Sequence, residues 1–249
     1  MQIGAQMYTT REACQTLDGF AATLQRIAEI GYRTVQVSGT CPYDGAWLKK
    51  QLDRTGLQCV LTHVPVPRLT RETEQVIRDH DAFGCRYVGL GYWAFDPARD
   101  MSWEKWLELF PPVAEKLYGN DKYFMYHNHD REFIRIGGQT YLELLASAVS
   151  AEKMGFTVDT FWVQAAGGDP AQWLERLSGR IPCIHLKDCA FDRSMTVVGE
   201  GNINFDRVFE KAEAGGTEYM LVEQDDCHGE DPLDCLRRSY LYLKACGFD

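Results

Sequence analysis

Three ionisable residues that each close a short apolar run are the strongest candidates for chemistry in this sequence: Asp159, His185 and Glu223. One imidazole and two carboxylates suit Mn²⁺, Mg²⁺, Zn²⁺ or Co²⁺ better than a soft metal. Burying the three groups without a cation would be costly. We therefore expect a divalent metal site. The alternative is a hydrogen-bonded Asp159–His185 pair, with Glu223 bridged to Lys187.

A fourth ligand is expected from the polar segment 126–133, which follows another apolar run. His127, His129 and Glu132 are the candidates. A histidine that titrates near neutrality also suits proton transfer. The same segment therefore offers a possible acid–base group.

The elements that must position these residues alternate regularly along the chain. Apolar runs predict strands at 2–8, 34–38, 57–63, 86–91, 122–127, 155–159, 181–186 and 218–223. Amphipathic segments predict helices at 18–31, 44–55, 70–83, 102–117, 139–153, 170–178, 205–214 and 231–245. Eight strand–helix units predict one (β/α)8 TIM barrel over residues 1–249. A doubly wound open sheet is the alternative, but no Gly-x-Gly-x-x-Gly follows the first strand.

The histidines support the barrel, because its active site lies at the C-terminal ends of the strands. Four of the six histidines, His63, His127, His129 and His185, fall at predicted strand ends. We therefore expect them to gather around one cavity.

Several motifs together resemble the sugar phosphate isomerase/epimerase family of xylose isomerase-like TIM barrels. The resemblance extends over essentially the whole chain. Its motifs are residues 126–133, 158–163, 166–170, 179–181, 185–188, 198–205, 222–225 and 239–243.

The resemblance implies a divalent metal held by Glu, Asp, His and Glu from strands five to eight, where it chelates adjacent oxygens of a ketose. Asp159, His185 and Glu223 match three of these positions, and His127 stands where many relatives carry the first glutamate. In the epimerases both glutamates move a carbon-bound proton. The resemblance therefore implies Glu223 as general base, with His127, His129 or Glu132 as its partner.

Other residues at the strand ends are expected to contact substrate. Trp162 stands where many relatives have a histidine, and its indole could stack on a sugar or simply pack. Lys187 is assigned to an oxyanion or to a substrate carboxylate or phosphate; otherwise it is a surface lysine paired with an acid. His63 is either a substrate contact or a capping histidine, and His129 is also assigned to substrate binding. The expected aromatic wall consists of Tyr8, Tyr92, Trp93 and Phe133.

The segment Gly199-Glu200-Gly201 predicts a tight turn before the last strand–helix unit. A phosphate-binding loop is the alternative interpretation. No Lys or Arg stands beside the glycines, and this favours the turn.

Composition excludes several classes of protein. The 249 residues carry 36 acids against 26 bases, a net charge of −10, and an acidic surface binds nucleic acid poorly. We therefore disfavour an abasic-site endonuclease. No signal peptide or membrane span is predicted. Nine cysteines without a CxxC pair indicate reduced thiols, and hence a cytoplasmic protein. A homodimer is possible.

The sequence thus predicts a metal-dependent sugar or keto-sugar isomerase or epimerase, with Mn²⁺ as the expected ion and Zn²⁺, Mg²⁺ or Co²⁺ as alternatives. Elimination from a keto-glycoside, an inosose or a dehydroshikimate, by a lyase or dehydratase, is the alternative reaction. A non-catalytic sugar-binding barrel is a further hypothesis.

Overall fold

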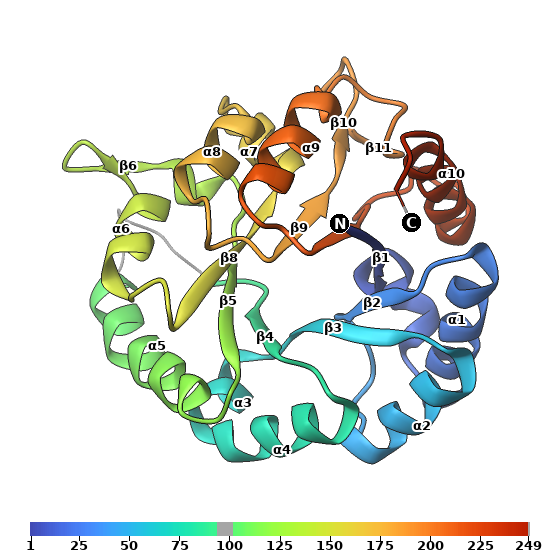
Figure 1. The fold of residues 1–249 in the computed structure, drawn as a ribbon, viewed down its shortest axis with the longest axis horizontal. Coiled ribbons are helices and arrows are strands. Elements are labelled where there is room, and N and C mark those ends of the chain that lie inside the picture. Colours follow the sequence, from blue (N-terminus) through green and yellow to red (C-terminus); the bar gives the residue numbers. More distant parts are fainter. Residues whose placement is uncertain (94–101, 249) are drawn as a thin grey trace.

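Eight parallel strands close into a barrel in the computed structural model, which describes residues 1–93 and 102–248. Their spatial order is β1-β12-β9-β8-β5-β4-β3-β2 (Figure 1). The barrel strands are β1 (Gln2–Gln6), β2 (Thr34–Val37), β3 (Gln58–His63), β4 (Tyr87–Leu90), β5 (Tyr123–His127), β8 (Met154–Asp159), β9 (Cys183–Leu186) and β12 (Tyr219–Val222). The predicted TIM barrel is confirmed, and the open sheet is excluded.

Helices surround this barrel (Figure 1). They are α1 (Leu17–Ile30), α2 (Gly45–Thr55), α3 (Val66–Arg71), α4 (Thr73–Phe83), α5 (Ser102–Tyr118), α6 (Tyr141–Ala148), α7 (Thr160–Ala165), α8 (Pro170–Arg176), α9 (Phe205–Ala214) and α10 (Pro232–Ala245). Helix α1 illustrates their packing, because Phe20, Leu24 and Ile27 recur at helical spacing and are fully buried.

Two predicted helices differ from those observed. The segment 70–83 is divided between α3 and α4, since Glu72 leaves helical geometry at φ −124° and ψ 29°. The helix predicted over 139–153 ends at Ala148, where Val149 turns to an extended conformation. The first strand is also shorter than predicted, because a 3₁₀ helix, η1 (Met7–Cys14), begins directly after Gln6.

The C-terminal ends of the strands carry short elements that periodicity did not predict. Besides η1 and α7, these are a 3₁₀ turn and two hairpins: η2 (Arg131–Phe133), β6 (Arg135–Ile136) with β7 (Gln139–Thr140), and β10 (Asp188–Cys189) with β11 (Met195–Thr196). Each has only two to eight residues, too few for a clear helical or alternating pattern. Together they build the rim around the barrel mouth.

The barrel interior shows why polar side chains gather at this mouth. Side chains alternate between the two faces of a strand, so residues two apart share a face. Buried Leu61, Met125, Cys183 and Leu221 belong to one apolar cluster. Two residues further along the same strands come His63, His127, His185 and Glu223. The apolar layer therefore forms the floor beneath a polar mouth.

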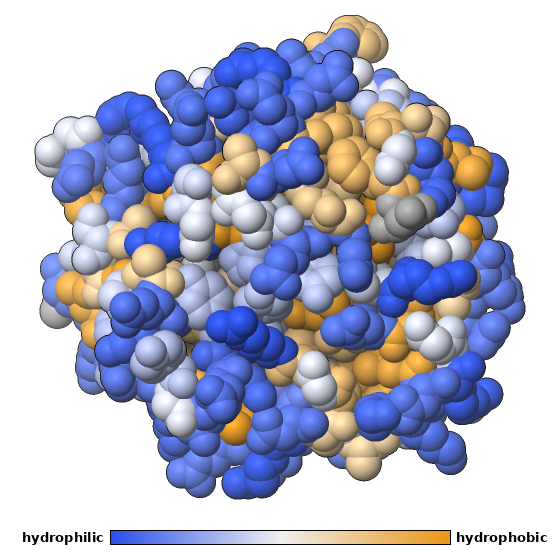
Figure 2. All heavy atoms as spheres, viewed as in Figure 1, coloured by the Kyte–Doolittle hydropathy of each residue, from blue (hydrophilic) through white to orange (hydrophobic). Residues whose placement is uncertain are grey.

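Most of the periphery seen in Figure 2 is hydrophilic, over the outer helices of Figure 1. Among the described residues, no helix combines the length and the apolar character needed to cross a bilayer.

His80 on α4 gives a prediction about stability, because this imidazole is buried away from the mouth. Its Nδ1 donates to Val76 O at 2.7 Å, and its Nε2 accepts from Thr62 Oγ1 at 2.8 Å. Burial lowers the pKa of His80 to about 4. The unfolded chain takes up this proton near pH 6.5, so the stabilisation is complete above that pH and is lost as the pH falls towards 4. At 1.36 kcal/mol per pKa unit, the loss is about 3 kcal/mol.

We expect His80→Asn to flatten the dependence of the free energy of unfolding on pH between 6.5 and 4, measured by urea denaturation. The variant is less stable throughout, so the slope rather than the absolute value is compared. Parallel curves for the two proteins would contradict the assignment.

Candidate metal centre and substrate cavity

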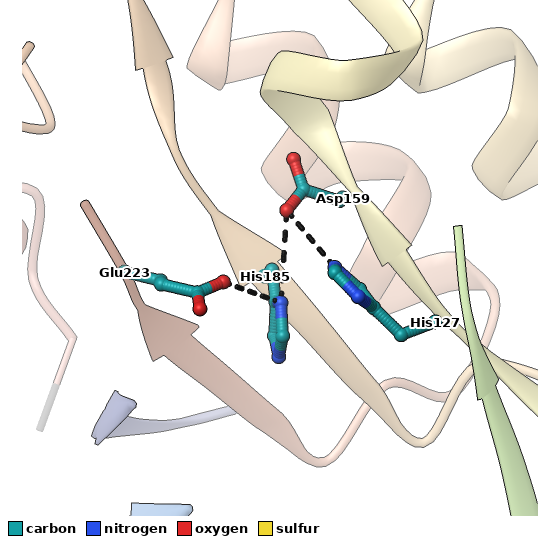
Figure 3. Close-up of side chains that lie close together, drawn as sticks. All are labelled: His127, Asp159, His185 and Glu223. Atoms are coloured by element: carbon teal, nitrogen blue, oxygen red, sulfur yellow. Dashed lines mark hydrogen bonds and ion pairs between the residues drawn. The ribbon is translucent and has the colours of Figure 1, made fainter. Parts of the chain in front are cut away.

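The barrel mouth brings together His127, Asp159, His185 and Glu223 from the ends of four neighbouring strands, β5, β8, β9 and β12 (Figure 3). All four are buried, and one donor atom of each lies within 4.8 Å of the other three. Of the strand-five candidates, the imidazole of His127 is the group that joins the cluster.

Hydrogen bonds on the outer sides of the two imidazoles orient their inner nitrogens. Gly91 O lies 3.0 Å from His127 Nδ1, and since a carbonyl only accepts, Nδ1 is the donor. In the neutral ring the lone pair is then on Nε2, which lies 3.1 Å from Asp159 Oδ2. His185 Nε2 likewise donates to Gln36 Oε1 at 2.7 Å. Outer partners of this kind fix the tautomer of metal-binding histidines.

The inner atoms of this cluster fit a divalent metal. His185 Nδ1 lies 2.8 Å from Glu223 Oε2 and 3.6 Å from Asp159 Oδ2. Yet, among the residues that the structure describes, neither His185 Nδ1 nor Glu223 Oε2 has a partner in hydrogen-bond geometry. Buried lone pairs that face each other need a positive charge between them. Two imidazoles and two carboxylates supply four metal-ligand atoms, a set suited to borderline divalent ions.

Lys187 is a second cation at the same oxygens. Its ammonium is buried and lies 3.1 Å from Asp159 Oδ2, 2.9 Å from Glu223 Oε2 and 2.9 Å from Asp225 Oδ2. The surface-lysine interpretation is therefore wrong. The Lys187–Glu223 bridge that was an alternative to the metal site exists beside the four-residue cluster. Three carboxylates against one ammonium leave an excess of negative charge.

The pKa values of these groups follow from their mutual contacts. Burial is the largest single effect on Asp159 and Glu223 and opposes their ionised forms, but Lys187 together with His127 and His185 outweighs it and lowers both pKa values. Burial also opposes protonation of His185, but the Glu223 and Asp159 carboxylates together outweigh it, so that the pKa of His185 rises. Burial raises the pKa of Asp225 to about 6, and the Glu223 charge adds to this effect.

A cavity of about 480 Å³ opens above the cluster. Most of the residues expected to contact substrate line it: Tyr8, His63, Tyr92, His129, Trp162 and Lys187. Burial lowers the pKa of His129 to about 3 and that of His63 well below its usual value. His63 Nε2 and His129 Nδ1 are buried and have no hydrogen-bond partner in the described part of the chain.

Glu132 lies outside this cavity. Its carboxylate accepts hydrogen bonds from Tyr126 Oη at 2.8 Å and from the His129 backbone at 2.7 Å. It thereby holds the segment that presents His129, and its oxygens do not face the metal cluster. Half of the expected aromatic wall is also absent, since Trp93 packs on Phe110 and Phe133 on Trp173, while Tyr8 and Tyr92 line the cavity.

Four polar residues at the site were not singled out from the sequence. Gln6 Nε2 donates to Glu223 Oε1 at 2.7 Å, and Asn128 Oδ1 accepts from the Asp159 backbone at 3.0 Å. Gln36 and Asp225 hold His185 and Lys187, as described above. Gln6, Gln36 and Asp225 lie at or just after strand ends, and that position is the signal that could have found them.

The turn at 199–201 is held by a carboxylate from the barrel mouth. The backbone N–H groups of Gly199 and Gly201 both donate to Asp188 Oδ2, at 3.0 and 2.9 Å. A side chain of the protein thus occupies the place that a phosphate would take in a phosphate-binding loop. This arrangement agrees with the turn interpretation.

Comparison with known proteins places these features in a family. An inosose dehydratase from Geobacillus kaustophilus (strain HTA426) is 24% identical over 267 residues, which cover 89% of this chain and 83% of that protein. A sugar phosphate isomerase/epimerase structure from Parabacteroides distasonis ATCC 8503 has a TM-score of 0.85 at 21% identity, covering 98% of this chain and 93% of that one. For an L-ribulose 3-epimerase structure the TM-score is 0.77 at 18% identity, with 98% and 94% covered.

At these identities the structural likeness establishes the fold. The family model described as "xylose isomerase-like TIM barrel" matches residues 24–246, most of the chain. The protein therefore belongs to the xylose isomerase-like TIM barrel family.

Proposed function

We propose that the protein is a metal-dependent isomerase or epimerase of a sugar or keto-sugar, and that it abstracts a proton beside a carbonyl group. The observation that carries this proposal is the cluster of four converging donors at the floor of the cavity. His127, Asp159, His185 and Glu223 would hold the ion, with Mn²⁺ expected and Zn²⁺, Mg²⁺ or Co²⁺ as alternatives. A bound divalent ion would polarise a substrate carbonyl and stabilise the negative charge that develops on its oxygen.

Glu223 takes the carbon-bound proton in this mechanism. Its Oε1 is held by Gln6 at 2.7 Å, and its Oε2 lies 2.9 Å from Lys187 Nζ. These contacts fix the carboxylate at the cavity and keep it ionised, as a general base requires. Lys187 thus orients Glu223 and Asp159 and balances part of their charge.

His129 is the strand-five candidate best placed to contact a substrate, and it would do so as a neutral imidazole, because burial lowers its pKa to about 3. Nδ1 of His127 is engaged by Gly91, and the Glu132 carboxylate is engaged by Tyr126 and the backbone. The His129 ring lies at the cavity, 5.4 Å from the Trp162 ring, with Nδ1 unpaired among the described residues. Of the three strand-five candidates, His129 therefore keeps a nitrogen for a substrate.

Elimination is the second candidate reaction. A single carboxylate base suffices to begin it, and the relative with 24% identity is an inosose dehydratase. The same proton abstraction would then expel a β-substituent instead of reprotonating the carbon.

Incubation of the metal-loaded protein with a panel of ketoses, keto-glycosides and inososes in D₂O tests the proposal. Isomerisation or epimerisation predicts deuterium beside the carbonyl with all carbons and oxygens retained, read by NMR and mass spectrometry. Loss of water or of an aglycone would instead support elimination. Protein stripped of metal by a chelator is the control. Absence of exchange and of elimination across the panel, with metal bound, would overturn the proposed function.

A further inference from the structure

Asp225 stands at the wall of the cavity with most of its hydrogen-bonding capacity unused. It follows Glu223 by two residues, and its side chain is 24% exposed. Oδ2 accepts from Lys187 at 2.9 Å, whereas Oδ1 is buried and has no partner among the described residues. A carboxylate can accept about four hydrogen bonds. Asp225 therefore has the capacity to accept a further hydrogen bond from a substrate hydroxyl.

The contacts of Lys187 leave its ammonium poorly suited to bind an anion. Carboxylate oxygens of Asp159, Glu223 and Asp225 lie within 3.1 Å of Nζ, the last as a hydrogen bond and the other two as ion pairs. Among the cavity-lining residues that the structure describes, Lys187 is the one lysine or arginine. The three carboxylates already more than balance its charge.

Asp159, Glu223, Asp225 and Lys187 together carry a net charge of about −2 when ionised. A bound divalent ion would bring this net charge to zero. A phosphate dianion placed in the same cavity would then add two uncompensated negative charges. A substrate hydroxyl would instead find an acceptor in Asp225. Because Asp159, Glu223 and Lys187 are almost fully buried, both effects are stronger than at a surface.

We propose that the cavity takes an unphosphorylated polyhydroxy ketone, and that Asp225 determines this specificity by accepting a substrate hydroxyl and repelling a phosphate. The inference rests on the proposed function for the class of substrate. Asp225 has no part in the proton transfer itself; it acts on substrate choice.

Matched ketose pairs test the inference on the metal-loaded protein. Dissociation constants for D-fructose and D-fructose 6-phosphate, and for D-ribulose and D-ribulose 5-phosphate, would be measured by calorimetry. We expect the free sugar of a pair to bind at least ~10-fold more tightly, which corresponds to about 1.4 kcal/mol. Asp225→Asn removes the charge with little change of shape, and should shift the ratio at least ~10-fold towards the phosphate.

Asp226→Asn is the matched control. This neighbouring carboxylate is 69% exposed and accepts from the His228 backbone, so the wild-type ratio should persist. Equal or tighter binding of the phosphorylated sugars by the wild type, or failure of every free ketose to bind, would overturn the inference without any variant. An unchanged ratio in a folded Asp225→Asn protein would do the same.

The two proposals fail separately. Selective binding of free sugars without deuterium exchange would overturn the proposed function and leave the specificity standing. Exchange that occurs with sugar phosphates alone would support the proposed chemistry and overturn the assignment of Asp225.

Discussion

Replacement of Glu223 by glutamine is expected to slow the exchange of substrate hydrogen with D₂O by ~10³-fold, within the range by which a general base accelerates a reaction. Glutamine keeps the size of the side chain and one oxygen for the Gln6 contact, but it cannot take a proton. The rate would be measured on the substrate found in the ketose panel. Saturating Mn²⁺ is needed, because Glu223 is also a proposed ligand, and the metal content of the variant must be determined alongside.

Glu218→Gln supplies a matched control on the same segment of chain. Glu218 directly precedes β12 at the opposite end of the barrel, where its carboxylate accepts from Tyr87 Oη at 2.6 Å. We expect this variant to retain the wild-type exchange rate. A Glu223→Gln protein that binds metal and exchanges within tenfold of the wild type would show that another group takes the proton.

The position of Glu223 illustrates what sequence can predict about such a site. Parallel strands of a barrel bring their C-terminal ends to one mouth, and side chains alternate along each strand. Apolar runs that stop at Asp159, His185 and Glu223 therefore predicted their convergence, whereas the choice of His127 over His129 and Glu132 came from the structure. The resemblance added the type of reaction, which neither spacing nor composition could supply.

The burial of Lys187 follows from the same alternation of side chains along a strand. Lys187 follows His185 by two residues and so shares the inward face of the strand. The side chain is accordingly 1% exposed, among three carboxylates. If the alternation of side chains is extended one residue past the end of β9, it already predicts that Lys187 points inward and is not a surface lysine.

Glu132 and Trp162 mark the limit of such reasoning, because short turns set their directions. The 3₁₀ turn η2 directs the Glu132 carboxylate to Tyr126 and the His129 backbone. Helix α7 begins directly after Asp159, whose Oδ1 accepts from the Trp162 backbone at 3.0 Å. Helices of three to six residues depend on such individual hydrogen bonds, and they are too short to show a hydrophobic periodicity in the sequence.

The second large effect is expected for the metal itself, when Asp159 is replaced by asparagine. The amide oxygen of asparagine can still cap α7 through the Trp162 backbone, since Asn is as good an N-cap as Asp. The charge at Oδ2, towards which His127, His185 and Lys187 converge, is lost. Asp159 supplies one of only two carboxylate charges at the centre, so affinity for Mn²⁺ should fall by roughly 100-fold. Calorimetry and the metal content of the purified protein would measure it.

Two further variants separate the effect of charge from that of folding. Asp169→Asn changes another helix-capping aspartate, at α8, and should leave metal affinity unaltered because its side chain lies outside the cluster. Lys187→Met should act in the opposite direction and tighten Mn²⁺ binding, because it removes a positive charge from the two carboxylates that the ion would use. A metal load in Asp159→Asn equal to that of the wild type would refute the assignment of the centre. Weaker binding in Lys187→Met would show that the ammonium supports the ion instead of competing with it.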